Sequence, residues 1–183
     1  MQSPSPRMPE QIAPTRTDSV PMPTGSAGPA DADARLTAEL ASVLSGARRR
    51  ALRDRDTQVD TAHLLHSLLE ADPEVRAAFD GGHQVARVLG YLVQRSIGYG
   101  LRWQGTVEDS GAVPTVRDRA VPGWSPPAVI ALTAAMERAA RRGDLRAGGL
   151  DLLAALAADR ECRAVEVLER AGVDARSLAG RLA

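Results

Sequence analysis

The chain contains no lysine. All 23 of its basic residues are arginines, and 23 acidic residues balance them, so the formal net charge is zero. The absence of lysine excludes a phosphate-loop lysine and a lysine Schiff base, and with them ATP hydrolysis of the phosphate-loop type. A zero net charge supplies no global field that would attract nucleic acid or an anionic membrane. Any partner must therefore be recognised by a local surface.

Cysteine, aromatic residues and long apolar runs are also scarce. Cys162 is the single cysteine, which excludes an internal disulfide and is typical of a reducing compartment. One Phe, two Tyr and two Trp leave the core to Leu, Val and Ala, a composition that favours helices. The sequence has neither a run of about 18 apolar residues nor a signal peptide at its start. We therefore expect a cytoplasmic protein that does not contact membranes.

What the sequence does contain is an internal repeat with an offset of 88 positions, from His63 to Asp151. An apolar residue followed by a good helix N-cap opens each copy, Leu36-Thr37 in the first and Trp124-Ser125 in the second. Further identities at this offset pair Leu64 with Leu152, Leu65 with Leu153, Leu68 with Leu156 and Asp56 with Asp144. A repeated supersecondary unit has this signature.

Apolar residues at spacings of three and four predict four helices in each copy. In the first copy, we expect helices at 37–53, from 60 or 61 onward, at 73–79 and at 83–95. In the second, we expect helices that begin at 125, at 148 or 149, near 165 and at 174. Each group of four has too little core to fold alone. The sequence therefore predicts an all-α monomer of eight helices, in which two pseudo-symmetric four-helix repeats pack against each other.

The remaining segments differ in composition from the repeats. Residues 1–33 are rich in Pro, Ser and Gly and have no apolar periodicity, so we expect a disordered leader. Repeat one spans 34–95 and repeat two spans 124–183. Between them, 96–123 reads as a long connector, with a short strand-like piece at 101–107.

The motif Thr61-x-His63-Leu64-Leu65 opens the second helix, and a short third helix, a glycine-containing turn and a fourth helix follow it. This pattern resembles the repeated N-terminal domain of Clp-type AAA+ unfoldases, in particular the ClpC kind. The segment 164–174 also looks like the third helix, the turn and the fourth-helix cap of that domain. The resemblance covers 34–183, and we expect no ATPase module beside it. It implies a standalone N-domain, which in the family recruits substrates, adaptors and certain antibacterial peptides to the unfoldase.

The chain departs from the family at two positions. The family motif is Gly-Thr-Glu-His-Leu-Leu-Leu, and its Glu helps to bind the guanidinium of phosphorylated arginine. Ala62 and Leu150 stand at the two corresponding places. A charge-assisted pair needs its carboxylate. We therefore expect that this chain does not recognise phosphoarginine.

Trp124 is the residue with the clearest functional interpretation. As the apolar residue before an N-cap, it can form a hydrophobic staple with Val129. The resemblance implies a second role, because the family often has an aromatic residue here and uses it to bind peptides. The expected peptide groove comprises Trp124, Leu36, Leu40 and Leu44, with Arg48 at its rim. The expected ligands are Clp components, substrate or adaptor proteins, and cyclic-peptide antibiotics that target ClpC.

A metal site is the main alternative for the histidines. His63, His66 and Glu70 are spaced i, i+3 and i+7, which could place three ligands on adjacent helical turns. The second copy has Asp151 and Ala154 at the histidine positions, and one helix offers no fourth ligand. We favour packing and helix-end hydrogen bonding for His63, and we expect neither a metal nor a cofactor.

The remaining candidates concern nucleic acid and catalysis. The arginines between Arg48 and Arg55 could bind a phosphate backbone, but interspersed aspartates and missing aromatics favour a solvated helix face. Cys162 and Ser125 have no nearby histidine in sequence and no strand-turn-helix elbow. We therefore expect a non-catalytic binding module that acts as an adaptor or as a ligand-sequestering decoy. The alternative is an enzyme or a nucleic-acid-binding helical domain with an unrecognised site.

Overall fold

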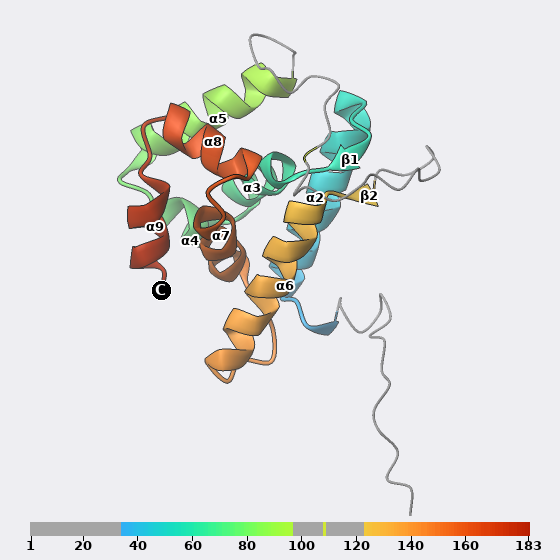
Figure 1. The fold of residues 1–183 in the computed structure, drawn as a ribbon, viewed down its shortest axis with the longest axis vertical. Helices are drawn as coiled ribbons and strands as arrows, with labels where there is room; N and C mark the ends of the chain where they lie inside the picture. The colour runs from blue at the N-terminus through green and yellow to red at the C-terminus, as the bar shows by residue number, and fades with distance from the viewer. Residues whose placement is uncertain (1–33, 97–107, 109–122) are drawn as a thin grey trace, which may run out of the picture.

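The computed structural model describes residues 34–96, 108 and 123–183. These residues form eight helices and two very short strands (Figure 1). In the first repeat the elements are α2 (Ala38–Asp54), β1 (Gln58–Val59), α3 (Thr61–Ala71), α4 (Pro73–Ala77) and α5 (Gly82–Ser96). In the second they are β2 (Gly123–Trp124), α6 (Pro126–Arg141), α7 (Gly149–Ala158), α8 (Arg163–Arg170) and α9 (Ala175–Arg181). The predicted all-α fold of eight helices is confirmed.

The same local signals begin and end the first helix of each repeat. Thr37 caps α2 by accepting a hydrogen bond from the Leu40 backbone N–H at 3.2 Å, and Ser125 caps α6 in the same way. Arg55, the C-cap of α2, lies in the left-handed region with φ 59°, and Gly143, 88 positions later, directly follows the C-cap of α6 with φ 83°. The repeat seen in the sequence is therefore also a repeat of backbone conformation.

The two repeats exchange equivalent backbone contacts. Val59 pairs with Trp124 in the parallel β1–β2 ladder, and Leu36 forms a parallel bridge with Ala147. Trp124 is the equivalent of Leu36 in the second repeat, and Ala147 is the equivalent of Val59. Each of the two first-repeat residues thus pairs with the equivalent of the other. The flanking hydrogen bonds match as well, since the N-cap Ser125 donates to Val59 O at 2.9 Å and Thr37 donates to Ala147 O at 2.9 Å. This reciprocity is what a pseudo-twofold axis between the repeats produces.

The second helices of the repeats, α3 and α7, lie at the centre of the molecule (Figure 1). The helix α3 contacts α8, the short helix that follows α7, and α7 contacts α4, the short helix that follows α3. Thr61 Oγ1 at the start of α3 accepts from Ala164 N of α8 at 3.0 Å. Gly149 at the start of α7 lies so close to α4 that an added Cβ would be 2.0 Å from Asp72 Oδ2. The two repeats therefore share one core.

Leucine dominates that core, as the composition predicts. A fully buried leucine contributes about 1.5–3 kcal/mol relative to an exposed one. The largest fully buried apolar side chains are Leu40, Leu64, Leu65, Leu68, Leu69, Leu92, Leu152, Leu153, Leu156, Leu168 and Leu178.

Several expectations need refinement or cannot be compared. The third helix ends at Ala77 instead of about 79, and α7 begins at Gly149 with Gly148 as its N-cap. The leader 1–33 and the strand-like piece 101–107 lie outside the described residues. In the part of the chain that the structure describes, no helix combines the length and apolarity needed to cross a bilayer.

Candidate functional site

The surface around Trp124 joins the two repeats. Trp124 is half-buried in β2, directly before the N-cap of α6, and packs against the core. The guanidinium carbon of Arg48, on α2, lies 4.8 Å from the centroid of the Trp124 ring, which is a cation–π contact. The predicted rim residue and the predicted aromatic anchor are therefore neighbours.

The three leucines of the predicted groove lie deeper. Leu36, Leu40 and Leu44 are exposed by 7%, 0% and 8%, so all three belong to the core. In this conformation a ligand can reach Arg48 and the exposed part of Trp124, whereas the three leucines are buried in the core cluster against which Trp124 packs. A peptide-binding role for these five residues stays a prediction, as does the staple between Trp124 and Val129, which is 48% exposed.

The two positions associated with phosphoarginine recognition differ in environment. Ala62 is fully buried near the start of α3, whereas Leu150 on α7 is 37% exposed. Neither side chain can pair with a guanidinium. The expected absence of phosphoarginine binding stays a prediction, and Ala62 offers no surface on which to install it.

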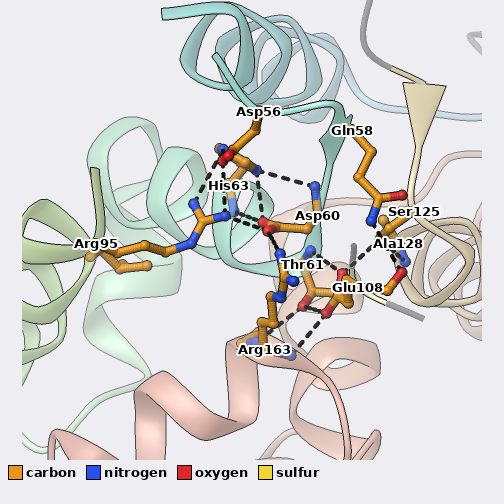
Figure 2. Close-up of polar contacts among 12 residues, drawn as sticks. Asp56, Gln58, Asp60, Thr61, His63, Arg95, Glu108, Ser125, Ala128 and Arg163 are labelled. Carbon is orange, nitrogen blue, oxygen red and sulfur yellow. Dashed lines mark hydrogen bonds and ion pairs between the residues drawn. The ribbon is translucent and has the colours of Figure 1, made fainter. Parts of the chain in front are cut away.

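A buried polar network lies beside Ala62, at the seam between the repeats (Figure 2). Its centre is Glu108, a connector residue that is only 4% exposed. The Glu108 carboxylate accepts from Thr61 N at 2.9 Å, from Arg163 N at 2.8 Å and from Ser125 Oγ at 2.6 Å. It also accepts from the Thr61 hydroxyl. One carboxylate thus accepts hydrogen bonds from free N–H groups at the starts of α3 and α8. Its negative charge also interacts favourably with the positive ends of both helix dipoles.

Asp60, the N-cap of α3, forms the second half of the network. Its carboxylate accepts from Arg163 Nη1 at 2.7 Å, from His63 N at 3.0 Å and from the Arg95 guanidinium. Burial acts to raise the pKa of Asp60, but His63, Arg95 and Arg163 together outweigh burial and hold this pKa well below its usual range. Asp60 is therefore a charged, fully paired residue of the core.

His63 connects Asp60 to the loop that precedes α3. Its Nδ1 is 3.1 Å from Asp60 N and 2.7 Å from Asp60 Oδ1, and its Nε2 is 3.0 Å from Asp56 Oδ2. Burial lowers the pKa of His63, but the contacts with Asp56 and Asp60 outweigh it, and the net effect raises this pKa. This is the helix-end hydrogen bonding that we expected for His63.

Asp56, Asp60 and His63 are the described residues whose donor atoms lie close enough together to hold a metal ion. The guanidinium of Arg95 already binds both carboxylates, and that of Arg163 binds Asp60. A cation at this point would have to compete with these two permanent positive charges. The arrangement therefore fits an ion-pair network and does not fit a metal centre.

His66 and Glu70, the other two residues of the predicted metal site, contact each other and α2. His66 Nε2 is 3.4 Å from Glu70, and Glu70 pairs with Arg50 of α2. These residues take no part in the Asp60 network.

The two candidate nucleophiles have structural contacts. Cys162 is buried, its Sγ donates to Leu156 O at 3.4 Å, and burial raises its pKa to about 11. Ser125 Oγ accepts from Ala128 N at 3.2 Å and donates to Glu108. Neither has a histidine base among its described contacts, and the acceptor of the Ser125 hydroxyl, Glu108, is a buried carboxylate that also accepts from Thr61 N and Arg163 N.

Comparisons with known proteins give the fold a name. No protein-family model and no curated protein sequence matches the chain. The structure is similar to the N-terminal domain of the caseinolytic-protease-associated chaperone ClpD from Arabidopsis thaliana, with 18% identity, 81% of this chain and 92% of that chain covered, and a TM-score of 0.57. It is also similar to a chain studied in work on a malarial protein secretion system, with 13% identity, the same coverage and a TM-score of 0.59. The chain therefore has the fold of a Clp-type N-terminal domain.

Proposed function

We propose that this chain is a non-catalytic peptide- or protein-binding module of the Clp proteolysis system, working in the cytoplasm with a ClpC-type unfoldase. The observation that carries the proposal is the position of Trp124, which is half-buried at the seam between the repeats and covered on one ring face by Arg48. On the fold of a Clp N-domain, this is where the resemblance implies an aromatic residue that binds peptides.

This surface fits a ligand with an apolar group that packs on Trp124 and a polar or acidic group next to it that contacts Arg48. Tryptophan and arginine are the residue types most enriched at the energetic centres of interfaces. Trp124 packs against the buried core and is already in contact with Arg48, so little side-chain entropy is lost when a ligand packs on it. Substrate segments, adaptor proteins and cyclic-peptide antibiotics are ligands with suitable apolar groups.

A recognition domain that is added to an unfoldase as a separate chain can act in two ways. As a decoy, it lowers the free ligand concentration whenever its own concentration exceeds the dissociation constant. As an adaptor, it must also contact the unfoldase while the ligand stays bound. The two roles have opposite effects on proteolysis.

A degradation assay tests the proposal and separates the two roles. Purified full-length chain is added to a ClpC-type unfoldase, its protease and a substrate that the unfoldase N-domain recognises. A decoy slows degradation in proportion to its concentration, and an adaptor accelerates it. Trp124→Ala should abolish either effect, whereas Leu145→Ala, which changes a 92% exposed leucine between α6 and α7, should not. Degradation at the same rate with and without the chain would contradict the proposal.

A further inference from the structure

A basic cavity lies between α2 and α3, and Trp124 is not among the residues that line it. Its volume is about 430 Å³, within the range of roughly 300–1,000 Å³ that is typical of ligand pockets. Three arginines of α2 line it, Arg49, Arg50 and Arg53, and α3 contributes Ser67 and Glu70. Three arginines of the basic run therefore line this cavity, although Arg49 and Arg53 are also exposed, as expected for a solvated helix face.

Two polar side chains that line this cavity have no partner among the described residues. Arg49 is exposed and has no ion-pair partner among the described residues. Ser67 is only 4% exposed, yet its hydroxyl makes no hydrogen bond in the structure. Buried hydroxyls normally have a partner, so an unpartnered one that lines a cavity indicates a missing acceptor. Gly46 permits this arrangement, because a Cβ at its position would lie 3.3 Å from Ser67 Oγ.

The charges around the cavity favour an anion. The three lining arginines outnumber the one lining acid, Glu70, which Arg50 neutralises. Asp54, next to Arg53 at 3.3 Å, is the other nearby acid. The pKa of the adjacent His66 is lowered to about 4, first by burial and then by the charge of Arg50, so His66 adds no positive charge at neutral pH.

We propose that this cavity binds a phosphate group, with Arg49, Arg50 and Arg53 as charge-assisted donors and Ser67 Oγ as a neutral donor. A guanidinium group can donate two parallel hydrogen bonds to two oxygens of one phosphate, because its N–H groups are arranged in a planar fork. A ligand in this cavity must compete with the Glu70 carboxylate for Arg50, and this competition favours phosphate over a carboxylate. A phosphate monoester carries a charge of about −1.5 to −2 at neutral pH, so it competes for Arg50 more strongly than the single negative charge of Glu70.

The second repeat provides an internal comparison. At the 88-residue offset, Arg49 corresponds to Glu137, Ser67 to Ala155 and Gly46 to Ala134. The equivalent face between α6 and α7 therefore carries an acid in place of the unpaired arginine and lacks the hydroxyl. A phosphate site is expected in the first repeat alone. It is separate from Ala62 and Leu150, and it does not depend on ligand binding at Trp124.

Isothermal titration of the full chain tests this site at constant ionic strength, with chloride as the background anion. The probes are inorganic phosphate and a short peptide that contains one phosphoserine, with the unphosphorylated peptide as a blank. Saturable binding of phosphate or of the phosphopeptide supports the site. Equal affinity for the two probes indicates that the free anion is the ligand, whereas tighter binding of the phosphopeptide indicates a phosphorylated side chain.

Variants locate the binding. Arg49→Ala should weaken it by about tenfold or more, because a hydrogen bond to a charged group is lost. Ser67→Ala should weaken it several-fold, and Glu70→Gln should tighten it by removing a competing charge. Arg141→Ala, at the position equivalent to Arg53 in the second repeat, is the matched control and should leave binding unchanged. Circular dichroism checks that each variant is folded. Absence of saturable binding, or binding that none of the three changes alters, would overturn the proposal.

Discussion

Arg163 Nη1 donates to Asp60 Oδ2 at 2.7 Å, although 103 residues separate the two along the chain. Arg163 is the first residue of α8 in the second repeat, and Asp60 is the N-cap of α3 in the first. Both are buried, with exposures of 8% and 1%. The pair therefore joins the repeats inside the core, where its charges are poorly screened.

Arg163→Met should lower the free energy of unfolding by about 3–5 kcal/mol, because the change removes one partner of a buried ion pair and leaves Asp60 with less compensation. Urea denaturation followed by circular dichroism measures the change. Arg176→Ala, on the exposed side of α9, should alter stability by no more than about 0.5 kcal/mol. Equal stability of the two variants would show that the Asp60 network does not hold the repeats together.

Glu108→Gln tests whether the connector residue caps the two helices as a charged group. The amide keeps the size of the side chain, but it replaces one acceptor oxygen with an NH₂ group that faces donors from Thr61, Ser125 and Arg163. We expect a loss of about 1.5–3 kcal/mol in the same denaturation experiment. Glu169→Gln, which removes a charge elsewhere on α8, serves as the control and should change stability little.

His66 should make the protein less stable as the pH falls from about 6.5 to about 4. Burial and the charge of Arg50 lower its pKa to about 4, so the unfolded chain takes up the proton before the folded chain does. The stabilising difference is present above pH 6.5 and is lost toward pH 4. Denaturation at pH 7 and at pH 5 should show a smaller pH effect for His66→Gln than for the parent chain.

Gly149→Ala should destabilise the protein by about 1–3 kcal/mol, because the new methyl group would overlap Asp72 Oδ2 and touch Val75 where α7 meets α4. Gly90→Ala on α5 is a matched control with nothing within 4 Å of the added Cβ. Because alanine is the better helix former, that control should be neutral or stabilising by up to about 1 kcal/mol. Thermal unfolding of both variants checks the difference, and equal melting temperatures would contradict the tight contact between the repeats.

The helices could be predicted because their signals are local. Thr37, Asp60 and Ser125 each precede an apolar stripe with helical spacing, and each is an N-cap in the structure. The repeat offset also predicted which positions are equivalent. The two-residue strands were missed because a segment so short shows no periodicity.

The polar network at the seam could not be predicted for a different reason. Its contacts are non-local: 103 residues separate Arg163 from Asp60, and 47 separate Glu108 from Thr61. Glu108 lies in a connector without helical patterning, and Arg95 and Arg163 look like ordinary helix arginines in the sequence. Trp124 and Arg48, which the sequence assigned to one groove, are in contact in the structure, but the groove itself stays a prediction. Helical spacing alone cannot tell a core leucine from one that lines a groove.

Direct binding to Trp124 tests the central claim most directly. Isothermal titration of the full chain with a cyclic-peptide antibiotic that targets ClpC-type N-domains should give saturable binding for the parent chain. Trp124→Ala should weaken that binding by more than tenfold, because truncating an aromatic anchor costs about 2 kcal/mol or more, while circular dichroism shows the fold unchanged. No binding by the parent chain, or equal binding by the folded variant, would contradict the account of this surface as a Clp-type ligand site.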